Sequence, residues 1–133
     1  MDQEVKVSIA GIPYQVSIEA RDHRWLADEP NDVGGEDTGP QPGEILLSSL
    51  GACTAITLKM YAARKKWPLE DVQIELRYNS EAKPDANTTV IESDIHLVGN
   101  LSEEQRARLM QIARNCPVHK ILSNPISLVN KAV

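Results

Sequence analysis

The sequence of 133 residues predicts a single α+β domain over residues 1–133, with a mostly antiparallel sheet packed on one long central helix. Two observations predict this fold class. Short segments of alternating apolar and polar residues come in hairpin-like groups, which is typical of half-buried antiparallel strands. One long segment, Glu44–Lys66, carries apolar and small residues on most of its sides, which is typical of a buried helix.

Three extended segments open the chain. Val5–Ile9 and Tyr14–Ile18 alternate apolar and polar residues, and the short link between them carries turn residues, so we expect an antiparallel hairpin. A third extended piece is expected at His23–Ala27. Asp28–Gln41, which is rich in Asp, Gly and Pro, is predicted to be a loop or a linker. A loop of this length within a compact domain is usually functional or disordered.

The central helix has clear signals at both ends. Pro42 and Glu44 suit its first turn, because proline lacks a backbone donor and a carboxylate complements the helix dipole. Positive charges gather near its C-terminus, and Trp67 and Pro68 end it. Its unbroken apolar run is too short, and too rich in Ser, Thr and Gly, for a membrane span.

In the second half of the chain two amphipathic strands are predicted at Val72–Tyr78 and Thr88–Val98, with a loop between them at Asn79–Asn87. Two helices are predicted to follow at Asn100–Asn115 and Pro117–Leu122, and a last short strand at Ile126–Val129. Ser102 and Gln105 form the pattern of a capping box at the start of the first of these helices. Cys116 and Pro117 interrupt the helical pattern, so we expect the second helix to begin there.

Composition and charge exclude several function classes. The net charge of −5 argues against a nucleic-acid partner, which requires a basic face. No basic-apolar leader or lipidation motif opens the chain, so we expect a cytoplasmic protein with no membrane partner. Two cysteines and three histidines at these positions match no usual zinc-ligand spacing, so no metal is expected. A structural disulfide is not expected in a cytosolic chain.

Cys53, near the middle of the central helix, has two readings. A free cysteine is often an inert, buried small hydrophobe. A reactive one requires a group that stabilises the thiolate, and the dipole offers little in the middle of a helix. A cation from elsewhere would be needed, and Arg21 and Arg24 are the candidates because they precede the loop that leads into this helix.

Cys116 also has two readings. If Pro117 is the first residue of a short helix, Cys116 occupies the N-cap position, where backbone donors and the positive helix end would stabilise its thiolate. Otherwise it is a cysteine at a helix break.

Glu44 and His119 each have two readings as well. Glu44 either pairs with an arginine or only complements the helix dipole. His119 either acts as a base or hydrogen-bond donor, or is a surface histidine on the short helix.

Two segments, Gly35–Tyr78 and Asn115–Leu122, resemble the OsmC and organic hydroperoxide resistance superfamily, and most closely its small OsmC-like branch. The most specific matches are Gly-Ala-Cys-Thr around Cys53, Trp-Pro-Leu-Glu-Asp-Val from Trp67, and Cys-Pro-Val-His-Lys from Cys116. The resemblance implies an OsmC-like fold and an intertwined homodimer, in which two sheets wrap around paired central helices.

The resemblance also implies a thiol peroxidase that acts on organic hydroperoxides in oxidative stress defence. It implies that Cys53 is the peroxidatic cysteine and Cys116 the resolving cysteine. A dithiol reductant, lipoyl-type in one branch, would restore both, with no metal or organic cofactor. The family holds its thiolate with an arginine and a glutamate. The glutamate position corresponds to Gly43 here, so we assign that role to the adjacent Glu44, and the arginine role to Arg24 with Arg21 as the alternative.

Two rival functions remain open. The chain could be an OsmC-like protein without peroxidase activity that binds an apolar ligand in a pocket lined by its cysteines. It could also be a structural dimer module. A guanidinium close to the Cys53 sulfur would favour the peroxidase, and two distant cysteines without a nearby cation would favour the ligand binder.

Overall fold

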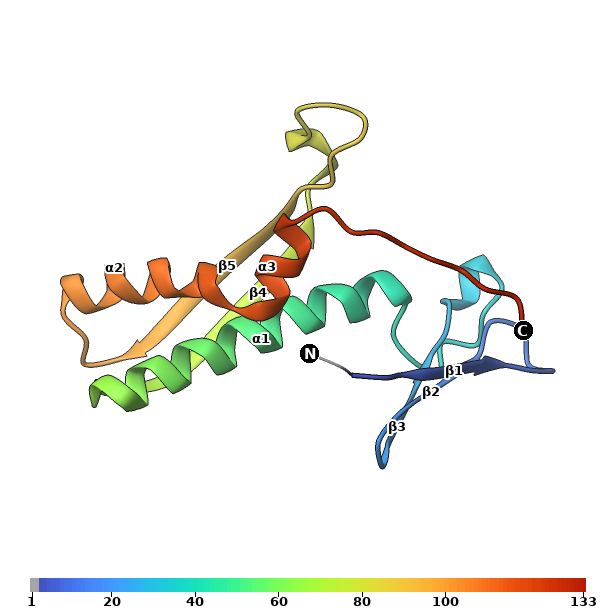
Figure 1. Ribbon diagram of the computed structural model, residues 1–133, viewed down its shortest axis with the longest axis horizontal. Helices are drawn as coiled ribbons and strands as arrows, with labels where there is room; N and C mark the ends of the chain where they lie inside the picture. The colour runs from blue at the N-terminus through green and yellow to red at the C-terminus, as the bar shows by residue number, and fades with distance from the viewer. Residues whose placement is uncertain (1–2) are drawn as a thin grey trace. The chain divides into compact units, whose positions relative to one another are not determined.

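The computed structural model describes residues 3–133 and contains both helices and antiparallel strands, which confirms the α+β class (Figure 1). The chain forms two compact units, one up to Leu46 and one from Leu47 to Val133. The boundary between the units falls within the long helix α1, Pro42–Lys65. The assignment of residues 1–133 to one domain stays a prediction.

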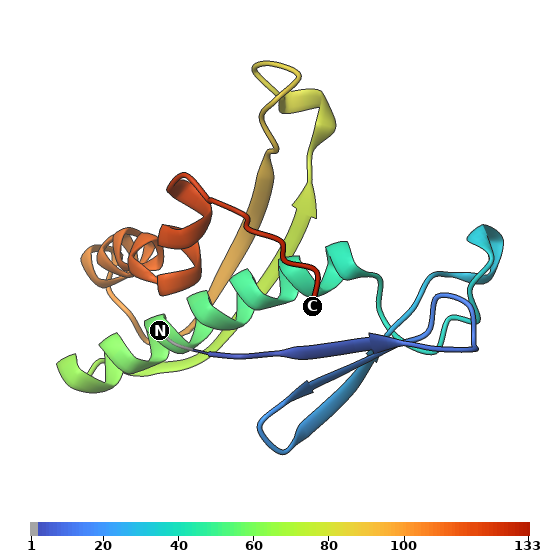
Figure 2. The ribbon, with the colours of Figure 1, turned by 45° about the vertical axis from the view of Figure 1, so that its right-hand side comes forward.

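The first unit contains a three-stranded antiparallel sheet in the order β1-β2-β3, drawn in blue in Figure 2. Its strands are Lys6–Ile9, Val16–Ala20 and His23–Ala27. Ile9 faces Val16 across the first pair, so the predicted hairpin is confirmed. The second strand begins later than the sequence predicted because Tyr14 has φ 65°, a left-handed conformation that belongs to the turn and not to a strand.

The segment that follows β3 is a fixed loop and not a linker. It contains the 3₁₀ turn η1, Asn31–Val33, and is organised by the buried carboxylate of Asp28. That carboxylate accepts hydrogen bonds from the backbone N–H of Glu29 at 2.7 Å, and from the N–H and hydroxyl of Thr38 at 3.1 and 2.6 Å. A buried carboxylate is stable only when it is hydrogen-bonded in this way.

The Asp28 carboxylate gives the fold a predicted acid sensitivity. The hydroxyl of Thr38, aided by backbone N–H donors and opposed by burial, holds the pKa of Asp28 below its usual value of 3.8. A depressed folded-state pKa stabilises the fold above the unfolded value, and this contribution disappears as the pH falls through the folded-state pKa. We therefore expect Asp28→Asn to lower the urea midpoint at pH 7 more than Thr38→Val does. The difference between wild type and Asp28→Asn should begin to shrink near pH 3.8 and disappear only below the lower, folded-state pKa of Asp28. A constant difference across the pH range would contradict this assignment.

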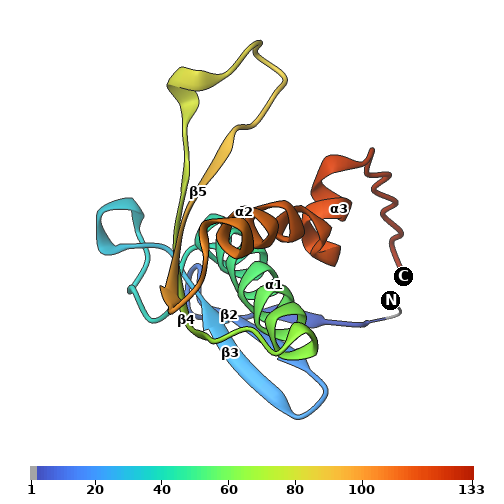
Figure 3. The same cartoon turned by 90° about the vertical axis from the view of Figure 1, so that its left-hand side faces the viewer.

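The second unit is a two-layer arrangement of helices on a hairpin. Figure 3 shows the hairpin of β4 and β5 on one side and α1, α2 and α3 on the other. The elements after α1 are β4 Leu69–Tyr78, η2 Ser80–Ala82, β5 Ile91–Gly99, α2 Glu103–Ile112, η3 Ala113–Asn115 and α3 Pro117–Ser123. The two strands are antiparallel, with Leu76 opposite Ser93. The predicted capping box of Ser102 and Gln105 is present at the start of α2.

The core of this unit lies between α1, α2 and the hairpin. Leu58 of α1 and Leu109 of α2 are completely buried, and Leu69 and Leu97 of the two strands pack with them. On α1 the buried side chains recur every four residues along one stripe, which faces this core. The side chains of Ile56 and Met60 are 58% and 61% exposed, so the expectation of a helix buried on most sides is wrong for this chain alone.

By length and composition α1 could cross a membrane, a test that core helices of soluble proteins also pass. Here one stripe of α1 packs on the hairpin core, and Lys59 donates hydrogen bonds to the carbonyls of Leu69 and Glu70 at 2.9 and 3.2 Å.

Several predicted boundaries differ from the structure, and one predicted strand is wrong. Ile126–Val129 forms no strand, because it has no pairing partner within residues 3–133 and Leu128 is 84% exposed. The second strand of the hairpin begins at Ile91, not at Thr88. The helix predicted to run to Asn115 is α-helical only to Ile112 and ends in the tighter turn of η3, which leads into Cys116 and Pro117.

Candidate active site

Both cysteines are free, and they come from distant parts of the second unit. Cys53 lies in the middle of α1 and is half-buried. Cys116 is completely buried at the start of α3. The prediction that Cys116 is an N-cap is confirmed, because it has extended dihedral angles and Pro117 is the first residue of the helix. A proline at this position forces the preceding residue out of the helical conformation.

The first turn of α3 brings the two sulfurs together. The backbone N–H of Val118 donates to the Sγ of Cys53 at 3.5 Å. The next N–H, that of His119, donates to the Sγ of Cys116 at 3.2 Å. These N–H groups belong to the first turn of a helix, where they have no partner within the helix. Two thiols from separate elements therefore share the donors of one turn.

Thr54 connects α1 to the second cysteine. Its hydroxyl donates to the carbonyl of Leu50 at 2.9 Å and lies 3.7 Å from the Sγ of Cys116. A hydroxyl has one proton, so the contact with sulfur is made by the thiol hydrogen of Cys116. The sequence analysis missed Thr54. The available signal was its place on the buried stripe, between Leu50 and Leu58 at intervals of four residues.

The surroundings of Cys53 favour the neutral thiol. Burial raises the pKa of the Cys53 thiol above its usual value of 9.0, and the proximity of Cys116 raises this pKa further. The N–H of Val118 and the hydroxyl of Thr57, one turn along α1, act in the opposite direction. None of these groups is cationic. Because the thiolate is the nucleophile, a reactive Cys53 needs a positive charge in addition to these contacts.

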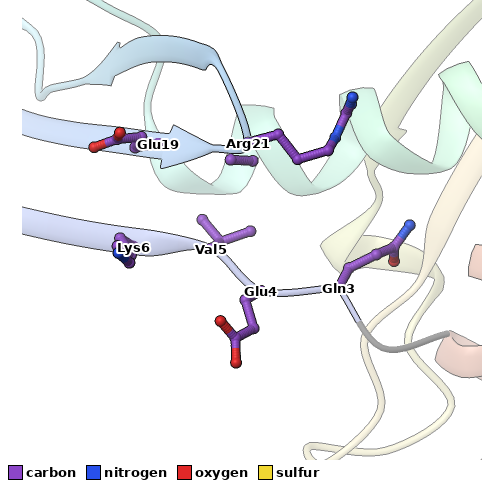
Figure 4. A pocket seen from close by; sticks show the side chains of 7 residues that line it. Gln3, Glu4, Val5, Lys6, Glu19 and Arg21 are labelled. Atoms are coloured by element: carbon purple, nitrogen blue, oxygen red, sulfur yellow. The ribbon is translucent and has the colours of Figure 1, made fainter.

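The other predicted site residues lie in the first unit. Arg24 of β3 pairs with Glu19 at 3.6 Å, and both side chains are largely exposed. The carboxylate of Glu44 accepts a hydrogen bond from the backbone N–H of Gln41 at 2.8 Å. This bond caps the N-terminal turn of α1. Arg21 follows β2 with φ 53° and lines a shallow pocket, where Figure 4 shows its side chain directed away from Glu19. The structure does not place these residues relative to Cys53.

The side chain of His119 lies beside Ser123. The hydroxyl of Ser123 donates to the carbonyl of His119 at 2.7 Å, and lies 3.3 Å from the Nδ1 of the same residue. Only the backbone N–H of His119 bonds a cysteine. Residues 3–133 contain no group of three His, Cys, Asp or Glu side chains arranged to bind a metal ion.

Comparison with known proteins identifies the family. The OsmC-like protein family matches residues 34–130, a range that contains both cysteines, Thr54 and all of α3. The chain belongs to the OsmC-like family. This confirms the resemblance that the sequence predicted. No curated protein gave a significant match.

Solved structures share this OsmC-like fold at low identity. An OsmC-like protein from Mycoplasma pneumoniae is 18% identical, with a TM-score of 0.73, over 92% of this chain and 89% of that one. An organic hydroperoxide resistance protein OsmC from Legionella pneumophila is 21% identical, with a TM-score of 0.67, over 92% and 89%. An organic hydroperoxide resistance protein from Elizabethkingia anophelis is 13% identical, with a TM-score of 0.65, over 91% and 87%. At these identities the likeness establishes the fold alone.

Proposed function

We propose that this OsmC-like protein is a thiol-dependent peroxidase that reduces organic hydroperoxides with Cys53 and Cys116. The observation that carries the proposal is the convergence of both sulfurs on the first turn of α3. A peroxidatic cysteine and a resolving thiol must lie close together to form a disulfide. The names of the Legionella and Elizabethkingia relatives, both organic hydroperoxide resistance proteins, support the same substrate class.

The proposed reaction has two steps in the protein. The Cys53 thiolate attacks one oxygen of the hydroperoxide, so that an S–O bond forms, the O–O bond breaks and the alcohol leaves with a proton. The Cys116 sulfur then attacks the resulting sulfenic acid at Cys53, an S–S bond forms and water leaves. The hydroperoxide gains two electrons and the two cysteines lose them. A dithiol reductant, for which we propose the lipoyl type, returns the electrons by disulfide exchange.

The first step requires a thiolate, and we assign the activating cation to Arg24. In the Cys116→Ser variant, Cys53 alone reacts with iodoacetamide, and the midpoint of the rate against pH reports its ionisation. We expect this midpoint to lie below 9.0 in the assembled protein and to move above it when Arg24 is replaced by glutamine, as burial then dominates. The matched Arg21→Gln variant should leave the midpoint unchanged. A shift with Arg21→Gln alone would transfer the role to Arg21.

We also propose that the protein is a homodimer whose two copies pair through the exposed side of α1. Ala52, Ile56 and Met60 are exposed on this side, and Ile56 and Met60 line a shallow groove with Val72 of β4. An exposed apolar stripe of this kind marks an interaction surface. Light scattering should give twice the chain mass of 14.7 kDa, and a mass of one chain would contradict the dimer.

One observation favours a second candidate function. Burial holds Cys53 as a neutral thiol, which suits a protein that binds an apolar ligand beside its cysteines without reducing peroxide. In this case oxidation of the thiols would be slow and would not depend on Cys53.

Titration of the reduced protein with cumene hydroperoxide separates the two functions. The peroxidase proposal predicts that each equivalent of hydroperoxide removes two thiols and yields one equivalent of cumyl alcohol. Hydrogen peroxide at the same concentration should react more slowly, because the site is partly apolar. Thiol loss no faster than that of free cysteine would reject the peroxidase and leave the ligand binder.

A further inference from the structure

A pocket of about 390 Å³ lies within the second unit and adjoins the cysteine site. Two of its lining residues contact the Cys116 sulfur, Thr54 through its hydroxyl and His119 through its backbone N–H. Its walls come from α1, β5, the end of α2, η3 and α3, and neither Cys53 nor Cys116 lines it. Its volume falls in the range of about 300–1,000 Å³ that is typical of small-molecule sites. All of its lining residues belong to one compact unit, so the pocket exists within a single protomer.

The pocket combines an apolar wall with a cationic group. Leu50, Ile91, Ile95, Met110 and Leu122 supply aliphatic and thioether surface from four different elements. Such surface favours a ligand with a hydrocarbon chain, since burying apolar area is the main source of affinity in sites of this kind.

The charged lining residues of the pocket favour a ligand with a negative charge. Arg114 lines the pocket and forms no salt bridge within residues 3–133, and His119 lines it as well. No aspartate or glutamate is among the lining residues, although the chain as a whole has a net charge of −5. A guanidinium without an acidic partner beside apolar walls is suited to a carboxylate, which it binds with two parallel hydrogen bonds.

Hydroxyl groups complete the polar lining. Thr89 and Ser93 contribute hydroxyls that can donate to a carboxylate oxygen, whereas the hydroxyls of Thr54 and Ser123 already donate to the carbonyls of Leu50 and His119. We propose that this pocket is a second, non-catalytic site that binds an amphipathic carboxylate, with the head group at Arg114 and the hydrocarbon chain against β5 and α3. The site does not depend on cysteine chemistry or on the proposed peroxidase activity.

Calorimetric titration of the reduced full chain with octanoate tests this site. Octanoate should bind, whereas 1-octanol, which lacks the charge, and acetate, which lacks the chain, should each bind much more weakly. Arg114→Gln should weaken octanoate binding by about ten- to a hundredfold, the value of a charge-assisted hydrogen bond. The matched control is Arg108→Gln, because Arg108 bonds Tyr61 and does not line the pocket.

The position of the ligand is checked by methyl NMR. Octanoate should shift the signals of Ile91, Met110 and Leu122, and Cys53→Ser should leave the affinity unchanged. Equal binding of octanoate and 1-octanol would reject the carboxylate site, as would equal affinities of the Arg114→Gln and Arg108→Gln variants. The carboxylate site would also be rejected if octanoate shifted only the signals of Ile56 and Met60, on the exposed side of α1. It would likewise be rejected if octanoate did not bind because a second copy of the chain fills the pocket.

Discussion

Cys53→Ser is expected to reduce the consumption of cumene hydroperoxide to the uncatalysed rate. The reason is that the proposed first step needs a thiolate as the nucleophile, and a serine hydroxyl is not oxidised by a hydroperoxide. Serine is nearly the same size as cysteine and Cys53 is only half-buried, so the fold should be retained. The measurement is the rate of alcohol formation by each reduced variant, with circular dichroism as the control for folding.

Cys116→Ser separates the two steps of the same reaction. It leaves the first oxidation intact but removes the thiol whose sulfur lies on the same helical turn, so a sulfenic acid should accumulate on Cys53. Dimedone labelling followed by mass spectrometry detects this product. If Cys53→Ser consumed hydroperoxide as fast as the wild type, the assignment of Cys53 as the nucleophile would be wrong.

Leu58→Ala is the substitution expected to have the largest effect on stability. Leu58 is completely buried and packs at the centre of the core between α1, α2 and the β4–β5 hairpin. Removing a buried leucine costs about 2–5 kcal/mol, from lost burial and from the cavity left behind. This is a large part of the total stability of a domain, which is about 5–15 kcal/mol. Urea denaturation followed by circular dichroism measures the change.

Ile56→Ala is the matched control on the same helix. It removes a side chain of the same size from an exposed position, so the folding of one chain should change by less than about 0.5 kcal/mol. If Ile56 lies in the proposed dimer interface, its replacement will instead weaken association, which appears as a dependence of the urea midpoint on protein concentration. Equal losses for both variants at high dilution would contradict the described core.

Local signals in the sequence predicted most of the fold. The alternation in Val72–Tyr78 and the cap formed by Ser102 are interactions between near neighbours, and both are present in the structure. The N-cap position of Cys116 was also predictable, because Pro117 restricts the residue before it. These features depend on a few adjacent residues, and the chain around them does not override them.

Features that depend on tertiary contacts were not predictable from the sequence. No local pattern indicates that Val118 donates to Cys53, which lies on a different helix. The hydrogen bonds from Thr38 to the Asp28 carboxylate also connect two residues that the sequence shows only as parts of a polar loop. The apolar alternation of Ile126–Val129 predicted a strand, but a strand requires a partner, and residues 3–133 of one chain provide none.

The most direct test of the account is a map of the disulfides formed when the reduced protein reacts with one equivalent of cumene hydroperoxide. The protein is digested without reduction, and the linked peptides are identified by mass spectrometry. The convergence on the first turn of α3 predicts a single linkage, between Cys53 and Cys116 of the same chain. Sulfinic acid on Cys53 with Cys116 still a free thiol would contradict the account, because it would mean that the two sulfurs do not act as a pair.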